Sequence, residues 1–196
     1  MINNLSYQVL KEALNDNGYR FFDSGEFNLN LIGIRTSAKE ANKFNDIFCV
    51  AFKQHGREML FCFDCTTDPG EFWLENPMNN KGAAILAPGQ YLGAWKIGYH
   101  LNKYPALTQV KPMIVYRDNN KDKTLDFDVP REAGLFGINC HYAAKDKKSI
   151  FVDKFSAGCQ VIADHGSFDF VLSLCHLGSK SWGNSFTYTL ITEDEL

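Results

Sequence analysis

Hydrophobic and polar positions follow two different rhythms along the chain. Near the N-terminus, apolar residues recur at helical spacing, which places them on one side of a helix. The pattern predicts a helix that Ser6 caps, that runs to about Asn17 and that Gly18 ends. The apolar stripe of this helix comprises Val9, Leu10, Ala13 and Leu14.

From residue 19 onward, short apolar runs broken by turn residues predict a chain composed mostly of strands. The predicted strands cover residues 46–53, 58–65, 83–86, 91–99, 113–116, 124–127, 135–140 and 185–191. The first two of these, and the fifth and sixth, are expected to pair as hairpins. A second helix is predicted from the helical spacing of Phe168, Val171, Leu172 and Cys175. We therefore expect a mainly β fold with a few helices, of the α+β class.

Length and composition fit one compact domain, or one with a small appendage. Hydrophobic residues make up 45% of the 196 positions and charged residues 22%, which is globular rather than disordered composition. The net charge of −3 gives no reason to expect a nucleic acid as partner. The sequence lacks an apolar run long enough to span a membrane. The N-terminal stretch does not resemble a signal peptide, so we expect synthesis in the cytoplasm unless another route releases the protein.

Six cysteines are present, and without a signal peptide we expect free thiols. Cys49, Cys62 and Cys175 sit in apolar runs and are expected to be small core residues. Cys62 and Cys65 have the spacing of zinc ligands, but positions three apart in a strand point to opposite faces. Residues 118–129 start like a calcium loop but lack its glycine and its final glutamate. We expect neither a metal nor another cofactor.

Cys159 differs from the other cysteines, and His141 lies eighteen positions before it. A neighbouring imidazole can take the proton of a thiol and so activate a nucleophile. The small residues Ala157 and Gly158 leave room for a carbonyl substrate, and a turn at Gly158 would aim N–H groups, including that of Cys159, at an oxyanion. Ser156 either contributes to that oxyanion site or holds the turn, and we favour the turn. The alternatives are that Cys159 is a buried structural thiol, and that His141 only caps the end of a strand or bonds to a core carbonyl.

The group that would orient His141 is left open by the sequence. Asn139, Asp153 and a backbone carbonyl are all candidates. Four aromatic residues are candidates for lining a substrate groove, although aromatic residues of a β-rich domain more often lie in the core; they are Trp73, Trp95, Tyr99 and Trp182.

The order of these motifs resembles the L,D-transpeptidase catalytic domain, also called the YkuD-like domain. Its histidine follows a hydrophobic strand, as in Ile138-Asn139-Cys140-His141, and its cysteine element is matched by Ser156-Ala157-Gly158-Cys159-Gln160-Val161. The upstream family element is matched by Ala87-Pro88-Gly89-Gln90-Tyr91. The resemblance covers roughly residues 45–192. The departures are Ala157 for the second histidine of the family, Gln160 near its arginine and Tyr142 for a glycine.

The resemblance implies a β-sandwich in which residues 45–196 form the catalytic domain and residues 1–44 pack on it as a helix and first strand. It implies cysteine-dependent acyl transfer, by transpeptidation or hydrolysis, on peptidoglycan stem peptides. Cys159 would form a thioester and His141 would act as general base and then as general acid. Candidate substrate-binding residues are Gln160, Asn139, Tyr142 and Trp95.

Two other classes of function remain open from the sequence. Loss of the family's histidine and arginine favours a non-catalytic virion or cell-wall-binding protein on the same fold. A zinc peptidase would use His141, an aspartate and His165. A cell-wall substrate, combined with an N-terminal stretch that does not resemble a signal peptide, fits a bacteriophage enzyme that is carried in the virion or released to the wall. The sequence leaves the oligomeric state open.

Overall fold

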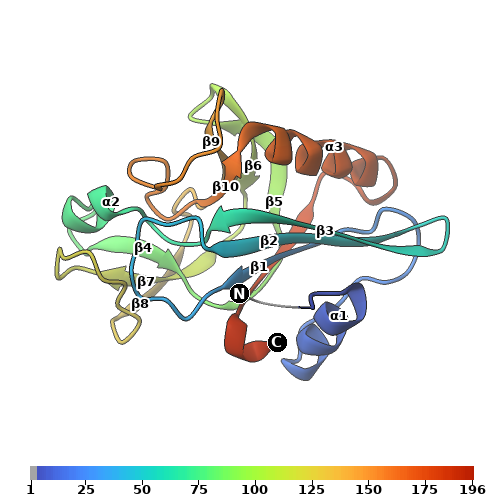
Figure 1. The fold of residues 1–196 in the computed structure, drawn as a ribbon, viewed down its shortest axis with the longest axis horizontal. Helices are drawn as coiled ribbons and strands as arrows, with labels where there is room; N and C mark the ends of the chain where they lie inside the picture. Colours follow the sequence, from blue (N-terminus) through green and yellow to red (C-terminus); the bar gives the residue numbers. More distant parts are fainter. Residues whose placement is uncertain (1–3) are drawn as a thin grey trace.

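The computed structural model describes residues 4–196 and shows a mainly β protein of the α+β class (Figure 1). The helices are α1 (Tyr7–Asp16), α2 (Glu71–Glu75), α3 (His165–Trp182) and the short 3-10 helix η1 (Glu193–Glu195). The strands are β1 (Asn30–Arg35), β2 (Asp46–Gln54), β3 (Arg57–Thr66), β4 (Ala83–Leu86), β5 (Gly89–His100), β6 (Tyr104–Gln109), β7 (Met113–Asp118), β8 (Arg131–Gly134), β9 (Cys140–Ala144), β10 (Gln160–Asp164) and β11 (Phe186–Thr192). The fold class predicted from the sequence is therefore confirmed.

Eight strands close into a barrel in the order β1-β11-β5-β6-β9-β10-β3-β2. Two of its pairs, β1 with β11 and β9 with β10, are parallel. The other three strands form a separate antiparallel sheet in the order β4-β7-β8. The expectation of a two-sheet sandwich is not met by this strand order, because the large sheet has no free edge along which to open.

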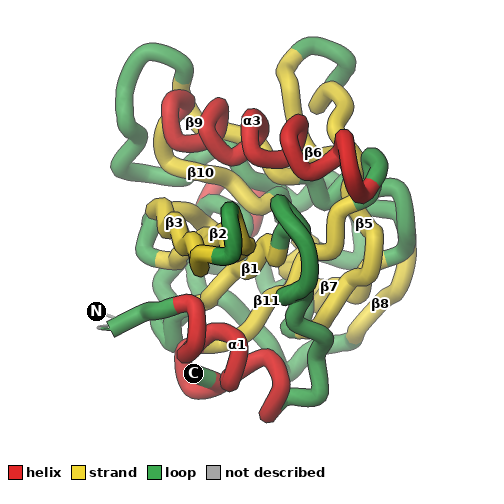
Figure 2. Tube along the Cα trace, turned by 90° about the vertical axis from the view of Figure 1, so that its right-hand side faces the viewer, coloured by secondary structure: helices red, strands yellow, loops and turns green. Residues whose placement is uncertain are grey.

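The main core fills the barrel and receives side chains from two other elements. Helix α3 contributes Phe168, Val171 and Cys175, and the small sheet contributes Leu86 and Val115. Figure 2 shows α3 and α1 on opposite sides of the barrel strands. Since α1 packs on the outer face of β1 and β2, the two helices bury different faces of the same sheet.

The predicted N-terminal helix, the hairpin of β2 and β3, and the helix after Cys159 are confirmed. Ser6 caps α1 through its side-chain oxygen, which accepts the Val9 N–H at 3.2 Å. All six cysteines are free thiols, as expected. Cys62 is nevertheless exposed rather than in the core, because it shares the outward face of β3 with Asp64. Within residues 4–196, no helix is both long and apolar enough to cross a membrane.

Two predicted strands are wrong. Residues 124–127 do not pair with β7, whose neighbours are β4 and β8. Their apolar residue Leu125 is instead buried in a small cluster under the second sheet. Residues 135–139 are a loop, because the side-chain oxygen of Gln109 accepts the N–H groups of Phe136 and Ile138 at 3.0 and 2.9 Å, in place of a strand partner. His141 consequently lies within β9 and does not follow a strand.

Trp95 does not line a substrate groove. Its side chain is fully buried, its ring stacks on Tyr188 at 4.3 Å between centroids, and its Nε1–H donates to the Ile138 carbonyl at 2.8 Å. Trp95 therefore supports the loop that precedes β9, and its link to the site is structural.

We expect Trp95→Phe to lower the free energy of unfolding by about 2–4 kcal/mol, because it removes a buried hydrogen bond and indole packing. Trp182→Phe is the matched control, since the Nε1–H of Trp182 also donates to a carbonyl, that of Glu26 at 2.8 Å, but at the surface. That change should cost less than about 1 kcal/mol. Urea unfolding of the two variants measures the difference, and equal losses would contradict the structural role of Trp95.

Candidate active site

His141 and Cys159 meet because β9 and β10 run parallel. The register pairs His141 with Val161 and Cys140 with Gln160. Cys159, one residue before β10, therefore lies beside the start of β9. Since side chains alternate across a strand, His141 and Cys159 share the face opposite to core residue Cys140. The pair predicted from the sequence is thus brought together in the structure.

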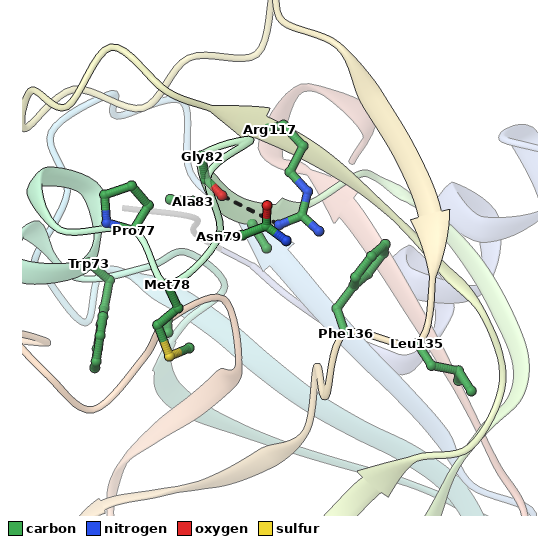
Figure 3. Close-up of a pocket in the computed structure, with 11 residues that line it drawn as sticks. Trp73, Pro77, Met78, Asn79, Gly82, Ala83, Arg117, Leu135 and Phe136 are labelled. Carbon is green, nitrogen blue, oxygen red and sulfur yellow. Dashed lines mark hydrogen bonds between the residues drawn. The ribbon is translucent and has the colours of Figure 1, made fainter.

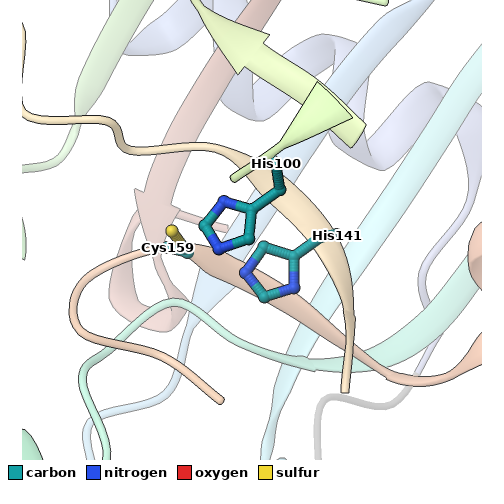
Figure 4. A group of neighbouring side chains, drawn as sticks. All are labelled: His100, His141 and Cys159. Atoms are coloured by element: carbon teal, nitrogen blue, oxygen red, sulfur yellow. The ribbon is translucent and has the colours of Figure 1, made fainter. Parts of the chain in front are cut away.

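His100, the last residue of β5, is the third member of the group and was missed by the sequence analysis. A ring nitrogen of His100, one of His141 and Sγ of Cys159 lie within 4.8 Å of one another (Figure 4). The two imidazole rings stack with their centroids 4.4 Å apart. The one available signal was a histidine directly after the predicted strand of residues 91–99. Nothing in the sequence indicated that β5 would end beside β9.

A backbone carbonyl orients His141. Nδ1 lies 2.8 Å from the carbonyl oxygen of Tyr142. Because a carbonyl only accepts, Nδ1 must carry the proton, and Nε2 is left with a free lone pair. That Nε2 atom is buried and has no hydrogen-bond partner within the described chain. Asp153, one of the candidates from the sequence, bonds instead to Asn42 at 2.9 Å.

His100 is held in the opposite tautomer by Asn139. The Gln109 N–H donates to Oδ1 of Asn139 at 2.8 Å, which fixes the orientation of the Asn139 amide. The amide nitrogen of Asn139 therefore faces Nδ1 of His100, at 3.0 Å, and donates to it. A neutral His100 then carries its proton on Nε2. The group consequently combines an acceptor nitrogen from His141 with a donor nitrogen from His100.

The resting site is uncharged. Burial raises the pKa of the Cys159 thiol to about 11, although the Asn139 backbone N–H opposes this, and the cysteine is only 8% exposed. Burial also lowers the pKa of His141 to about 4 against the opposing effect of the Tyr142 carbonyl, and lowers the pKa of His100. The segment around Cys159 is thus not the exposed one that its glycine and glutamine neighbours suggested.

The two pKa values determine the protonation state before substrate arrives. Burial disfavours both charged forms, because it raises the pKa of the Cys159 thiol and lowers the pKa of the His141 imidazole. The neutral pair is therefore the stable form.

The turn before Cys159 is fixed by Ser156 and Gly158. The Ser156 hydroxyl donates to the Cys159 carbonyl at 2.8 Å and accepts the Gly158 N–H at 3.1 Å. Gly158 has φ +123°, and a Cβ at this position would lie 2.4 Å from the carbonyl oxygen of Ala84. Within residues 4–196, the Cys159 N–H makes no hydrogen bond to another backbone group.

The remaining predicted residues take other positions. Gln160 is fully buried, where its oxygen accepts the Tyr188 hydroxyl at 2.8 Å, so it supports the core and not a substrate. Asn139 acts through His100. The side chain of Tyr142 packs edge-on against His165 at 4.4 Å, and its carbonyl serves His141. Ala157 lines a cavity beside the turn.

One thiol and two imidazoles are also a ligand set that suits zinc. However, a metal on Nε2 of His100 would require the proton on Nδ1, which faces the amide hydrogens of Asn139. His165, expected in a zinc peptidase, pairs with Asp169 at 3.4 Å and is not in the group. The hydrogen bonds around the group therefore favour thiol chemistry over metal chemistry.

No family model matches the chain, and no curated protein or solved structure matches it at a significant level. Function is therefore inferred from the side chains around Cys159 and from the order of motifs along the chain.

We expect Gly158→Ala to lower the free energy of unfolding by about 3 kcal/mol or more, because the new methyl group meets the Ala84 carbonyl and the backbone is strained. Gly137→Ala is the matched control, since it also has a positive φ, +76°, but nothing lies within 4 Å of its Cβ position. The control should lose about 1–2 kcal/mol. Thermal and urea unfolding test this difference.

We expect alkylation of Cys159 by iodoacetamide to rise steadily with pH up to about 10 without reaching a plateau, because only the thiolate reacts. Cys62 should react first, since it is exposed and the Cys49 thiol lowers its pKa. Peptide mass spectrometry between pH 6 and 10 follows both sites. A plateau for Cys159 below pH 8.5 would show that its thiolate is stabilised in the free protein, against this expectation.

Proposed function

We propose that the protein is a cysteine-dependent acyltransferase that acts on peptidoglycan stem peptides, by transpeptidation or hydrolysis. The observation that carries the proposal is the unpartnered Nε2 of His141, buried within 4.8 Å of the Cys159 sulfur and held by the Tyr142 carbonyl. A buried acceptor without a donor is costly, and such groups cluster at functional sites. A proton from the thiol would satisfy it.

In the first half-reaction, the Cys159 thiol, which donates to the Gly137 carbonyl at 3.4 Å in the resting site, turns its proton to Nε2 of His141. The sulfur attacks the peptide carbonyl as the proton moves, because the separated ion pair is unfavourable. The carbon–nitrogen bond then breaks, the leaving amine takes the proton from His141, and a Cys159 thioester remains. An amine or water gives its proton to His141 as it attacks the thioester. The carbon–sulfur bond then breaks, the acyl group leaves as an amide or acid, and His141 returns the proton to Cys159.

His100 supplies the donor in this scheme. Its Nε2–H faces the same space as the thiol and stabilises the negative charge that develops on sulfur or on the carbonyl oxygen. The Cys159 N–H is the second donor. Because the site is buried, each of these hydrogen bonds contributes more than it would in water.

The choice of substrate rests on the resemblance to L,D-transpeptidases. His141, the turn with Gly158 and Cys159, α3 and β11 follow one another along the chain, which is the motif order on which the resemblance rests, although His141 lies within β9 and does not follow a strand. The eight-stranded barrel with its separate small sheet differs from the β-sandwich that the resemblance implies. Delivery by a bacteriophage, in the virion or on release to the wall, is part of the same proposal.

A second candidate function is binding without turnover. It is favoured by the neutral thiol and by the 8% exposure of Cys159. A wall-binding protein would retain muropeptide affinity in Cys159→Ser and would show no product with the native chain. This outcome would replace the enzymatic proposal.

The decisive experiment incubates the protein with purified stem tetrapeptides and follows intact mass and products. We expect a thioester adduct at Cys159, its absence in Cys159→Ala, and a rate lower by about 10²–10⁴ in His141→Gln. His100→Phe keeps the ring stacking but removes the donor and should lower the rate by about 10². His176→Gln, on the exposed side of α3, is the matched control and should leave the rate unchanged. Full activity in Cys159→Ala would exclude this mechanism.

The pH dependence of kcat/KM tests the role of His141 separately. His141 accepts a proton only when neutral, so activity should fall as the pH falls through about 4. An unperturbed histidine would place that fall near 6.5. Initial rates between pH 3.5 and 8 on the native chain distinguish the two, and a fall centred at 6.5 would mean that His141 is not buried as described.

A further inference from the structure

A cavity of about 290 Å³ lies beside the turn that carries Cys159 (Figure 3). Ala157 of that turn lines it, and so does Phe136 of the loop whose next residue, Gly137, accepts the Cys159 thiol. Gly158 lies between Ala157 and Cys159, and Gly137 lies between Phe136 and the thiol, so the cavity is one residue away from Cys159 along both segments. Its other walls come from α2 and the loop after it, and from the small sheet.

Arg117 of β7 is the charged residue of this cavity. Its side chain is only 8% exposed, and its guanidinium stacks on the ring of Phe136 at 4.6 Å. Nε donates to Glu132 at 2.8 Å, and Nη1 reaches the Gly82 carbonyl at 3.4 Å. Nη2 has no partner within residues 4–196 and is not fully buried, and Arg117 lines the cavity. A buried guanidinium thus keeps unused donors.

The charges around Arg117 leave the cavity electropositive. Glu132 is shared between Arg117 and Lys81, which it meets at 2.8 and 2.9 Å, so the three groups carry one net positive charge. Asn79 contributes an uncharged amide to the same cavity. A carboxylate is the planar anion that matches a guanidinium edge.

The rest of the cavity is apolar. Trp73, Pro77 and Met78 form one side, and Leu135 and Phe136 form the other. Met78 and Leu135, on opposite sides of the cavity, are 75% and 66% exposed. A ligand body between them would cover both. Trp73 therefore does line a groove, in contrast to Trp95.

We propose that this cavity binds a ligand that carries a carboxylate next to an apolar group, with the carboxylate on Nη2 of Arg117. If the proposed acyl transfer holds, the ligand is part of the acyl donor, and the cavity selects donors with a free carboxylate near the scissile carbonyl. The binding itself does not depend on that reaction.

The test compares N-acetylleucine with its neutral match N-acetylleucinamide, on the full chain with Cys159→Ala so that no chemistry intervenes. We expect the carboxylate to bind roughly tenfold more tightly or better, because a charged hydrogen bond is gained. Calorimetry gives the affinities, and amide chemical shifts at Ala157 and Phe136 give the location. Arg117→Gln should reduce the carboxylate to the affinity of the amide.

Arg131→Gln is the matched control, because Arg131 also stacks on an aromatic ring, that of Tyr116 at 4.7 Å, in the same small sheet but outside the cavity. It should leave the preference intact. Ala157→Leu leaves Arg117 in place and should block both ligands by filling the cavity, which keeps the test decisive if Arg117→Gln does not fold. Equal affinities for the two ligands, or a preference that survives Arg117→Gln, would overturn the proposal. Carboxylate binding to the Cys159→Ala chain, together with no thioester adduct when the native chain is incubated with stem tetrapeptides, would contradict the acyl transfer alone.

Discussion

His141 stands beside Val161 because β9 and β10 pair in parallel, and the rest of the candidate site depends on that register. A slip of one residue would turn every side chain of β9 to the other face. Cys140 would then occupy the place of His141, and the imidazole would enter the packed core. The barrel prevents the slip, since β9 is also bound to β6 and β10 to β3. The chemistry of the site is thus secured by backbone hydrogen bonds.

Around that pair, neutral hydrogen bonds replace the carboxylate that often orients a catalytic histidine. The Tyr142 carbonyl fixes one imidazole as an acceptor, and Asn139 fixes the other as a donor. Neither partner carries a charge, so the effect of burial on the thiol and on His141 outweighs the opposing effect of their backbone hydrogen bonds. The site is therefore uncharged at rest, and its reactivity depends on proton transfer during attack.

Much of the local structure could be predicted from the sequence, because it follows from short-range patterns. The cap of α1 by Ser6 and the hairpin of β2 and β3 are of this kind. The proximity of His141 and Cys159 was predicted from the chemistry of a thiol and an imidazole, and not from a short-range pattern. The contacts between distant segments could not be predicted. Gln109 replaces a strand partner for residues 136 and 138, and β5 delivers His100 beside β9. Both depend on the order in which strands close the barrel.

The protonated state of the buried thiol also decides how the protein withstands oxidants. Peroxides attack the thiolate, and attack requires access, so a sulfur that is both neutral and enclosed reacts slowly. Cys62 has the opposite properties, being exposed and more acidic. It would be oxidised first. The Cys159 thiol is therefore expected to outlast Cys62 under oxidising conditions.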